Sequence, residues 1–93
     1  MKYHADVEIR DFDGGTWDDS FDLDASDSDE AITDAINRAG SWFQPHYRDD
    51  GKEIPHHERA AKLSIDLVEV DGDWSAQIEV DEDNYAPGNI TVY

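Results

Sequence analysis

The side chains that could do chemistry in this sequence are mostly carboxylates. The 93 residues include 24 Asp and Glu but only 7 Lys and Arg, with 4 His and no Cys, so the formal net charge is −17 at pH 7. Carboxylates can ligate hard cations, transfer protons or present fixed negative charge to a basic partner. Their spacing decides which of these roles the sequence favours.

The acid-rich segments do not match a calcium-binding loop. An EF-hand loop needs oxygen ligands at positions 1, 3 and 5, Gly at position 6 and Glu at position 12. A loop starting at Asp11 has Gly15 at position 5, and one starting at Asp22 has Asp27 at position 6. A loop starting at Asp81 has Tyr85 at position 5. We therefore expect neither a dedicated calcium site nor another metal cofactor.

The histidines and serines do not form a recognisable catalytic motif. His46, His56 and His57 with Glu58 could ligate a metal, but adjacent histidines on one turn point apart and no HExxH or Cys partner accompanies them. No G-x-S-x-G elbow is present, and Gly14-Gly15 is too short to cradle a phosphate. A general acid needs a pKa raised by burial, whereas most of the carboxylates fall on predicted outward faces. The sequence predicts no enzyme, no catalytic residue and no cofactor.

The charge is concentrated in two terminal blocks. Residues 1–30 hold 11 acids and 2 bases, and residues 63–93 hold 8 acids and no base. The segment between them, residues 31–62, holds 5 of each and is neutral. This distribution excludes a protein that tracks phosphates directly, and it excludes an electrostatic membrane anchor, because both need a basic surface. No apolar run approaches the roughly 20 residues of a membrane span. The first residues lack a secretory h-region and Cys is absent, so a cytoplasmic location is expected.

The hydrophobic pattern predicts elements that would position these acids. Tyr3 to Arg10 and Trp17 to Asp24 alternate with period two around the turn signal Asp13-Gly14-Gly15, so they predict a β-hairpin with an acidic outer face. Asp29 to Ala39 has apolar residues at helical spacing, with N-cap candidates before it and Gly40 after it as the C′ residue.

The rest of the chain predicts a second hairpin and a less regular middle. Leu63, Ile65 and Leu67 alternate before a shift to Val68 and Val70, which suggests a bulge or a strand covered on both faces. The predicted elements are strands over 63–70 and 74–81, a loop over 81–88, a short edge strand over 90–93 and a helical turn over 55–62. Residues 1–93 should therefore form one α+β domain, with an antiparallel sheet of two hairpins, four or five strands in all, packed on one main helix in the order ββ-α-ββ(β). The three Trp are expected in the core, although one at a hairpin turn could serve as an exposed anchor.

The strand geometry suggests how the acids could act together. Alternate residues along a strand repeat at about 6.6–6.8 Å. This matches two base-pair steps, because the phosphates of one DNA strand advance about 3.4 Å per step along the helix axis. Rows of short Asp side chains could therefore replace phosphates in a basic channel. The predicted partner-binding residues are Asp6, Glu8, Asp11, Asp13, Asp18, Asp22, Asp24, Asp71, Asp73, Glu79, Asp81, Glu82 and Asp83.

In size, charge and hairpin content the chain resembles the small acidic inhibitors of phages and mobile elements that mimic nucleic acid, including anti-CRISPR and anti-restriction proteins. The hairpin sequences Asp11-Phe12-Asp13-Gly14-Gly15 and Val70-Asp71-Gly72-Asp73-Trp74 and the helix over 29–39 carry this resemblance. It implies a stoichiometric blocker of a basic nucleic-acid-binding defence protein, for example a CRISPR effector occluded where it reads DNA or its PAM. The blocker would be a monomer or small homo-oligomer in the cytoplasm of the host cell.

Two other functions fit the composition. An acidic immunity protein or antitoxin would neutralise a basic nuclease toxin. A salt-adapted accessory domain would carry acids over its whole surface, and the 17 Asp, 7 Glu and 3 Lys match that style. The neutral middle segment favours a localised acidic face over a general adaptation.

Overall fold

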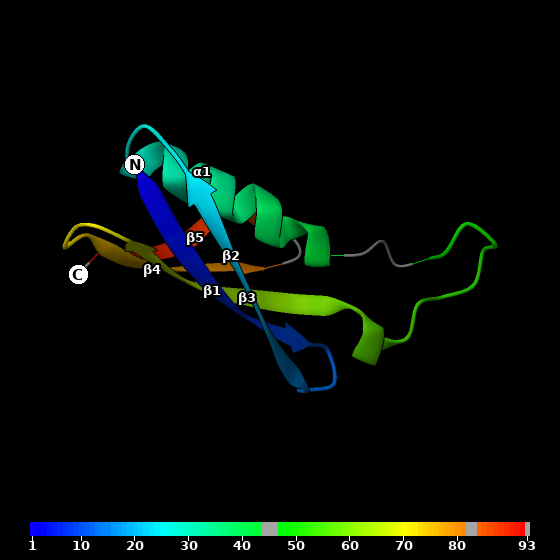
Figure 1. Cartoon of the computed structure of the whole chain (residues 1–93). Helices are drawn as coiled ribbons and strands as arrows, with labels where there is room; N and C mark the ends of the chain where they lie inside the picture. Colours follow the sequence, from blue (N-terminus) through cyan, green and yellow to red (C-terminus); the bar gives the residue numbers. More distant parts are fainter. Residues whose placement is uncertain (44–46, 82–83, 93) are drawn as a thin grey trace.

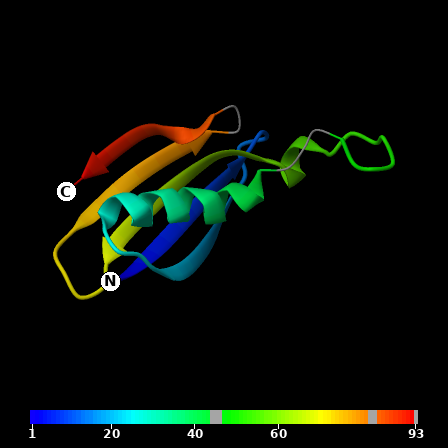
Figure 2. The same cartoon turned by 90° about the horizontal axis from the view of Figure 1, so that it is seen from above.

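A five-stranded antiparallel sheet and one α-helix form the fold. The computed structural model describes residues 1–43, 47–81 and 84–92. Its strands are β1 (Lys2–Asp11), β2 (Thr16–Asp24), β3 (Ala60–Glu69), β4 (Ser75–Asp81) and β5 (Asn84–Val92), arranged in the order β2-β1-β3-β4-β5. Helix α1 (Ser28–Ala39) lies obliquely across one face of this sheet (Figures 1 and 2). The predicted α+β class, with an antiparallel sheet packed on a helix, is confirmed.

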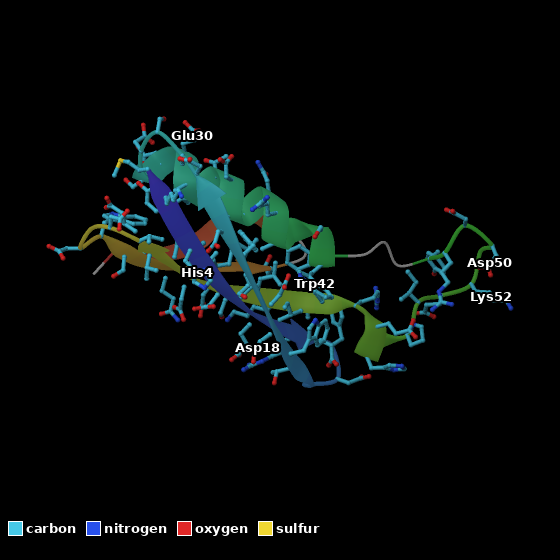
Figure 3. All side chains as sticks on the ribbon, in the orientation of Figure 1. His4, Asp18, Glu30, Trp42, Asp50 and Lys52 are labelled. Atoms are coloured by element: carbon cyan, nitrogen blue, oxygen red, sulfur yellow. The ribbon has the colours of Figure 1, made fainter. Side chains whose placement is uncertain are left out.

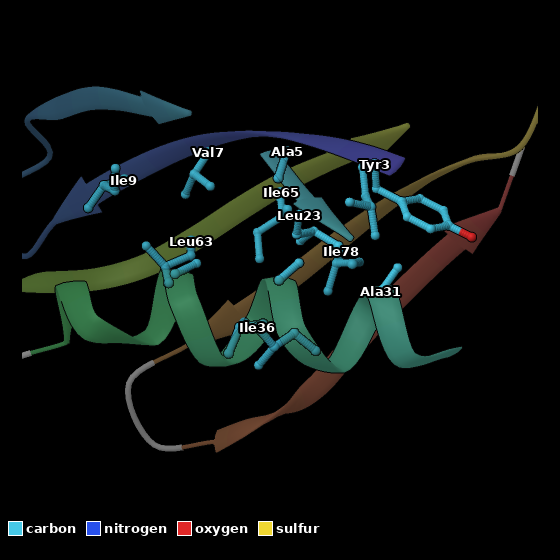
Figure 4. Packing of buried hydrophobic residues seen from close by; sticks show 14 of the residues in the cluster. Tyr3, Ala5, Val7, Ile9, Leu23, Ala31, Ile36, Leu63, Ile65 and Ile78 are labelled. Carbon is cyan, nitrogen blue, oxygen red and sulfur yellow. The ribbon is translucent and has the colours of Figure 1, made fainter. Parts of the chain in front are cut away.

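The core lies between the sheet and α1 (Figure 4). The inward residues of the central strands are fully buried, because period-two alternation places them all on the side of the helix. The helix contributes Ala31, Ala35 and Ala39 as its buried small residues, with Ile36 beside them. Small side chains allow its backbone to approach the sheet closely. The buried hydrophobic residues of the three central strands are Tyr3, Ala5, Val7, Ile9, Ala60, Leu63, Ile65, Leu67, Ala76, Ile78 and Val80.

Helix α1 begins as its sequence predicts but ends differently. Asp27 is the N-cap, and its carboxylate accepts the backbone N–H of Glu30 at 2.8 Å. Gly40 was predicted as a C′ residue, which usually takes a positive φ. That prediction is wrong, because Gly40 has φ −59° and starts the 3-10 turn η1 (Gly40–Trp42). The turn carries Trp42 back onto the edge strand β2.

Three predictions for the second half of the chain need correction. Strand β3 keeps one alternation to its end, so Val68 lies exposed on the face opposite the helix rather than in a bulge. The register shift of the β1–β3 pair lies instead between Arg10 and Asp11. The predicted helical turn shrinks to the 3-10 turn η2 (His56–Glu58), because strand pairing begins at Ala60. The last strand is a full element, β5, and it tolerates Pro87 because it lies at the edge of the sheet.

Residues 47–55 extend away from the sheet (Figures 1 and 2). An isolated bridge joins Tyr47 and Glu53, and Gly51 turns the chain with φ +81°. An ion pair between Arg48 and Glu58 fixes this loop to η2. Two of the seven bases, Arg48 and Lys52, therefore lie on this extended loop.

Candidate functional site

The face of the sheet opposite α1 has no covering layer within the described part of the chain, and we call it the open face. Along β1 it presents Lys2, His4, Asp6, Glu8 and Arg10, which alternate with the buried residues of the same strand. Figure 3 shows the side chains of His4 and Asp18 on this side, away from the helix. The face is polar and accessible, so it is the surface on which a partner could meet several strands at once.

Strand register gathers carboxylates at the middle of the open face. Asp6 lies opposite Asp66 of β3, and Glu8 lies opposite Asp18 of β2. We call these four residues the acidic centre. Both pairs place like charges directly across adjacent strands, an arrangement that destabilises a sheet.

The acidic centre lies in a shallow depression. The depression measures about 620 Å³, and its lining includes all four acids of the centre. Ser20, Ser64 and Gln77 contribute uncharged polar groups to the same lining. Such a surface offers oxygen acceptors from three adjacent strands to cationic donors.

The cations of the open face lie around the acidic centre. Arg10 Nη2 is 3.7 Å from Glu8 Oε1, and Lys62 Nζ is 3.2 Å from Glu79 Oε2. At the opposite end of β1 the N-terminal amine is 3.1 Å from Asp24 Oδ1. Neither Asp18 nor Asp66 has a cationic partner among the described residues. The depression therefore holds two carboxylates, Asp18 and Asp66, that no described residue neutralises.

His4 lies between two carboxylates of the open face. Its Nδ1 is 2.6 Å from Asp22 Oδ1 on β2, and its Nε2 is 3.0 Å from Asp6 Oδ1 on its own strand. The hydrogen bonds to Asp22 and then Asp6 raise the pKa of His4 above its ordinary value of 6.5. Its positive charge at neutral pH is thus favoured by two neighbours.

The structure places many of the predicted partner-binding residues on one surface, but not all of them. Asp13 lies in the β1–β2 turn, and Asp71 and Asp73 lie in the β3–β4 turn at the other end of the strands. Glu82 and Asp83 lie outside the described residues. The predicted residues that share the open face are Asp6, Glu8, Asp18, Asp22, Asp24, Glu79 and Asp81.

Asp11 has a role within the first hairpin turn rather than on the surface. Its side chain is buried, and Oδ1 accepts the backbone N–H groups of Asp13 and Gly15, both at 2.8 Å. A Cβ on Gly15 would lie 2.6 Å from Asp11 Oδ2, so this carboxylate fills the space that the glycine leaves. We therefore leave Asp11 out of the proposed contact surface.

Two ionisable residues that shape the acidic part of the open face, Asp66 and His4, were missing from the predicted set. Asp66 alternates with Ile65 and Leu67, so the period-two pattern already indicated an outward carboxylate. His4 alternates in the same way on β1. Its two carboxylate contacts depend on the pairing of β1 with β2, which places Asp22 directly beside it.

The tryptophans do not provide an exposed anchor. Trp17, Trp42 and Trp74 are all half-buried and pack against the core. Trp17 and Trp42 meet edge to face at 5.7 Å, and Trp42 Nε1–H donates to Asp19 Oδ2 at 3.1 Å. These contacts join η1 to the edge strand β2, so they have a structural role.

The histidines of the middle segment lie near a carboxylate but form no metal site among the described residues. His56 Nδ1 and His57 Nδ1 lie 3.9 and 4.0 Å from the Asp13 carboxylate. No group of three His, Cys, Asp or Glu side chains within residues 1–43 and 47–81 is arranged to hold a metal ion, and His46 lies outside the described residues.

No helix of the described chain is long and apolar enough to cross a membrane. Comparisons with protein families, with curated proteins and with solved structures give no match to this chain.

Proposed function

We propose that this chain is a stoichiometric protein inhibitor that blocks a basic nucleic-acid-binding defence protein, such as a CRISPR effector, by presenting its open face in place of nucleic acid. The observation that carries the proposal is the acidic centre, where Asp6, Glu8, Asp18 and Asp66 converge from three strands in one depression. Nothing in the proposal requires the chain to contact nucleic acid, a metal or a cofactor.

The geometry of a sheet suits this task. Residues two apart on a strand, such as Asp6 and Glu8, repeat at about 6.6–6.8 Å, and adjacent strands lie about 4.8 Å apart. The phosphates of each DNA strand advance by about 3.4 Å per nucleotide along the helix axis, so alternate strand positions match two base-pair steps in axial length. A rigid sheet holds these charges in place before binding, which reduces the ordering cost of the complex.

The energetics of the free protein also support a binding role. Directly opposed like charges destabilise a sheet, by an amount that we take as comparable to the roughly 0.2–1 kcal/mol that a favourable cross-strand pair contributes. Two such pairs, Glu8 with Asp18 and Asp6 with Asp66, lie side by side on the open face. Locally unfavourable arrangements are expected at functional sites, where a partner's cations can relieve them.

A salt-adapted domain is the second candidate, because acids also lie away from the open face. Asp29, Asp34, Asp49 and Asp50 belong to the helix and the extended loop. A general adaptation would need high salt for folding, whereas the proposed inhibitor should fold at ordinary ionic strength. Circular dichroism in 0.1 M and 2 M KCl separates the two, since folding only in the higher concentration would favour salt adaptation.

Affinity capture from a bacterial lysate tests the proposal with matched variants. The triple variant Asp6→Asn, Asp18→Asn, Asp66→Asn removes three charges from the depression. The control Asp34→Asn, Asp49→Asn, Asp50→Asn removes the same number elsewhere. We expect the wild type and the control to retain nucleic-acid-binding proteins in 0.1 M NaCl and to release them in 0.5 M NaCl. The first variant should not retain these proteins at either concentration. Equal capture by both variants, or capture that 0.5 M NaCl does not weaken, would contradict the proposal.

A further inference from the structure

Beyond the acidic centre, the geometry around His4 points to a proton-controlled clamp. We infer that the His4 imidazolium bridges Asp22 and Asp6, and that loss of its proton releases Asp6 into the depression of the open face. The consequence for binding rests on the proposed function, but the clamp itself does not.

The two contacts of His4 require two donors. Ionised carboxylates only accept hydrogen bonds, and a neutral imidazole has one N–H donor. Both ring nitrogens lie within 3.0 Å of a carboxylate oxygen, so only the imidazolium satisfies both contacts. The bridge joins β1 to the edge strand β2, because Asp22 lies directly opposite His4 in the register.

The surroundings of His4 indicate which contact the neutral form would lose. The shorter contact, 2.6 Å, joins Nδ1 to Asp22, so the neutral ring keeps its proton there. The Nε2 lone pair would then face Asp6 Oδ1 at 3.0 Å, which is repulsive. Asp6 lines the depression and would be left without its cationic neighbour.

No other charged group in the described part of the chain takes over the bridging role. Lys2 lies two residues away on β1 and pairs in register with Asp24 of β2. On β3 the residue opposite His4 is the apolar Val68, and the next outward residue along that strand is another acid, Asp66. Helix α1 covers the opposite face of the sheet. His4 is therefore the only described side chain placed between Asp6 and Asp22.

The pH dependence follows from the raised pKa of His4. A folded-state pKa above the unfolded value of about 6.5 makes the clamp fully stabilising below that pH. Its contribution is lost as the pH rises through the higher folded-state pKa. The clamp should therefore be closed in mildly acidic solution and open in alkaline solution.

An NMR titration of the free protein tests the clamp directly. The His4 ring resonances should titrate at higher pH in the wild type than in the variant Asp6→Asn/Asp22→Asn, and the neutral ring should carry its proton on Nδ1. Amide spectra at each pH report whether the variant keeps the fold. Titration of His4 at the same pH in both proteins would overturn the inference, as would an Nε2–H neutral ring.

A nona-arginine peptide with an acetylated N-terminus, whose charge does not change between pH 5.5 and pH 9, probes the consequence for binding. Between pH 5.5 and pH 9 in 0.1 M NaCl, its affinity for the wild type should rise roughly two- to fivefold more than its affinity for His4→Gln, as expected for one exposed ion pair. Equal gains in the two proteins would mean that His4 does not mask Asp6. Absence of any peptide binding would count against the proposed function, while the NMR titration would still decide the clamp.

Discussion

At the residue scale, the carboxylates of this chain divide into those that stabilise the fold and those that strain it. Asp11 and Asp27 accept backbone N–H groups at a turn and at a helix start. Asp66 and Asp18 have no such partner among the described residues and face like charges across the sheet. The same residue type therefore has opposite effects on stability, and the local geometry decides which.

The variant Asp66→Asn should stabilise the free protein and weaken its complex. Removing one member of the Asp6–Asp66 pair relieves repulsion of roughly 0.2–1 kcal/mol at low salt. Urea unfolding in 0.05 M NaCl measures the gain, and capture of the partner measures the loss. Asp49→Asn, on the extended loop, removes the same charge and should change neither quantity by more than about 0.5 kcal/mol. A destabilised Asp66→Asn would show that the opposed pair does not strain the sheet.

The variant Asp11→Ala should destabilise the fold. Its carboxylate accepts two backbone N–H groups in the first turn, and their loss should cost about 1–3 kcal/mol. Thermal unfolding provides the measurement. Asp13→Ala removes an exposed carboxylate from the same turn and should cost less than about 0.5 kcal/mol. Equal effects of the two substitutions would contradict the role that we give to Asp11.

At the element scale, period-two and helical patterns were sufficient to predict four strands and the helix. They failed where tertiary contacts decide the outcome. The chain continues from Gly40 into a 3-10 turn because Trp42 packs on Trp17 and donates a hydrogen bond to Asp19. These contacts join segments that are far apart in sequence. The length of β5 depends on its pairing with β4. The residues of β5, including Pro87 and Gly88, do not themselves suggest a strand of this length.

The start of α1 gives a test at this scale. Asp27→Ala removes the side-chain acceptor of the Glu30 N–H and should lower stability by about 1 kcal/mol. Asp27→Asn keeps an acceptor and should be nearly neutral, since Asn and Asp cap equally well. Chemical denaturation followed by circular dichroism compares the two variants. An equal loss in both would mean that charge, not the cap hydrogen bond, stabilises the helix start.

At the scale of the whole molecule, the open face brings acids that are far apart in the sequence onto a single surface. The sequence predicted the outward residues of each strand, and most of the candidate site follows from that alternation. It could not predict that β1 and β3 would be neighbours, which is what joins the two hairpin faces and brings Asp66 beside Asp6. The Asp6–Asp66 pair is a property of this topology, whereas the Glu8–Asp18 pair lies within the predicted first hairpin.

Salt should stabilise the free protein, because it screens the repulsion between the carboxylates of the open face. Raising NaCl from 0.05 to 0.5 M should add about 1 kcal/mol, which corresponds to about 4–8 °C in Tm for a domain of this size. The triple variant Asp6→Asn, Asp18→Asn, Asp66→Asn should gain less than the matched triple variant at Asp34, Asp49 and Asp50. Scanning calorimetry would measure both. Identical salt responses would show that the repulsion is spread over the whole surface.

The measurement that tests the central claim most directly is displacement of nucleic acid from a captured partner. A fluorescent duplex DNA bound to that partner is titrated with this protein while its anisotropy is recorded. The proposal predicts full release of the DNA at a stoichiometric end point. The control variant Asp34→Asn, Asp49→Asn, Asp50→Asn should release the DNA equally well, whereas the triple variant of the acidic centre should not release it. DNA that stays bound at saturation, with both molecules on the partner together, would contradict the account.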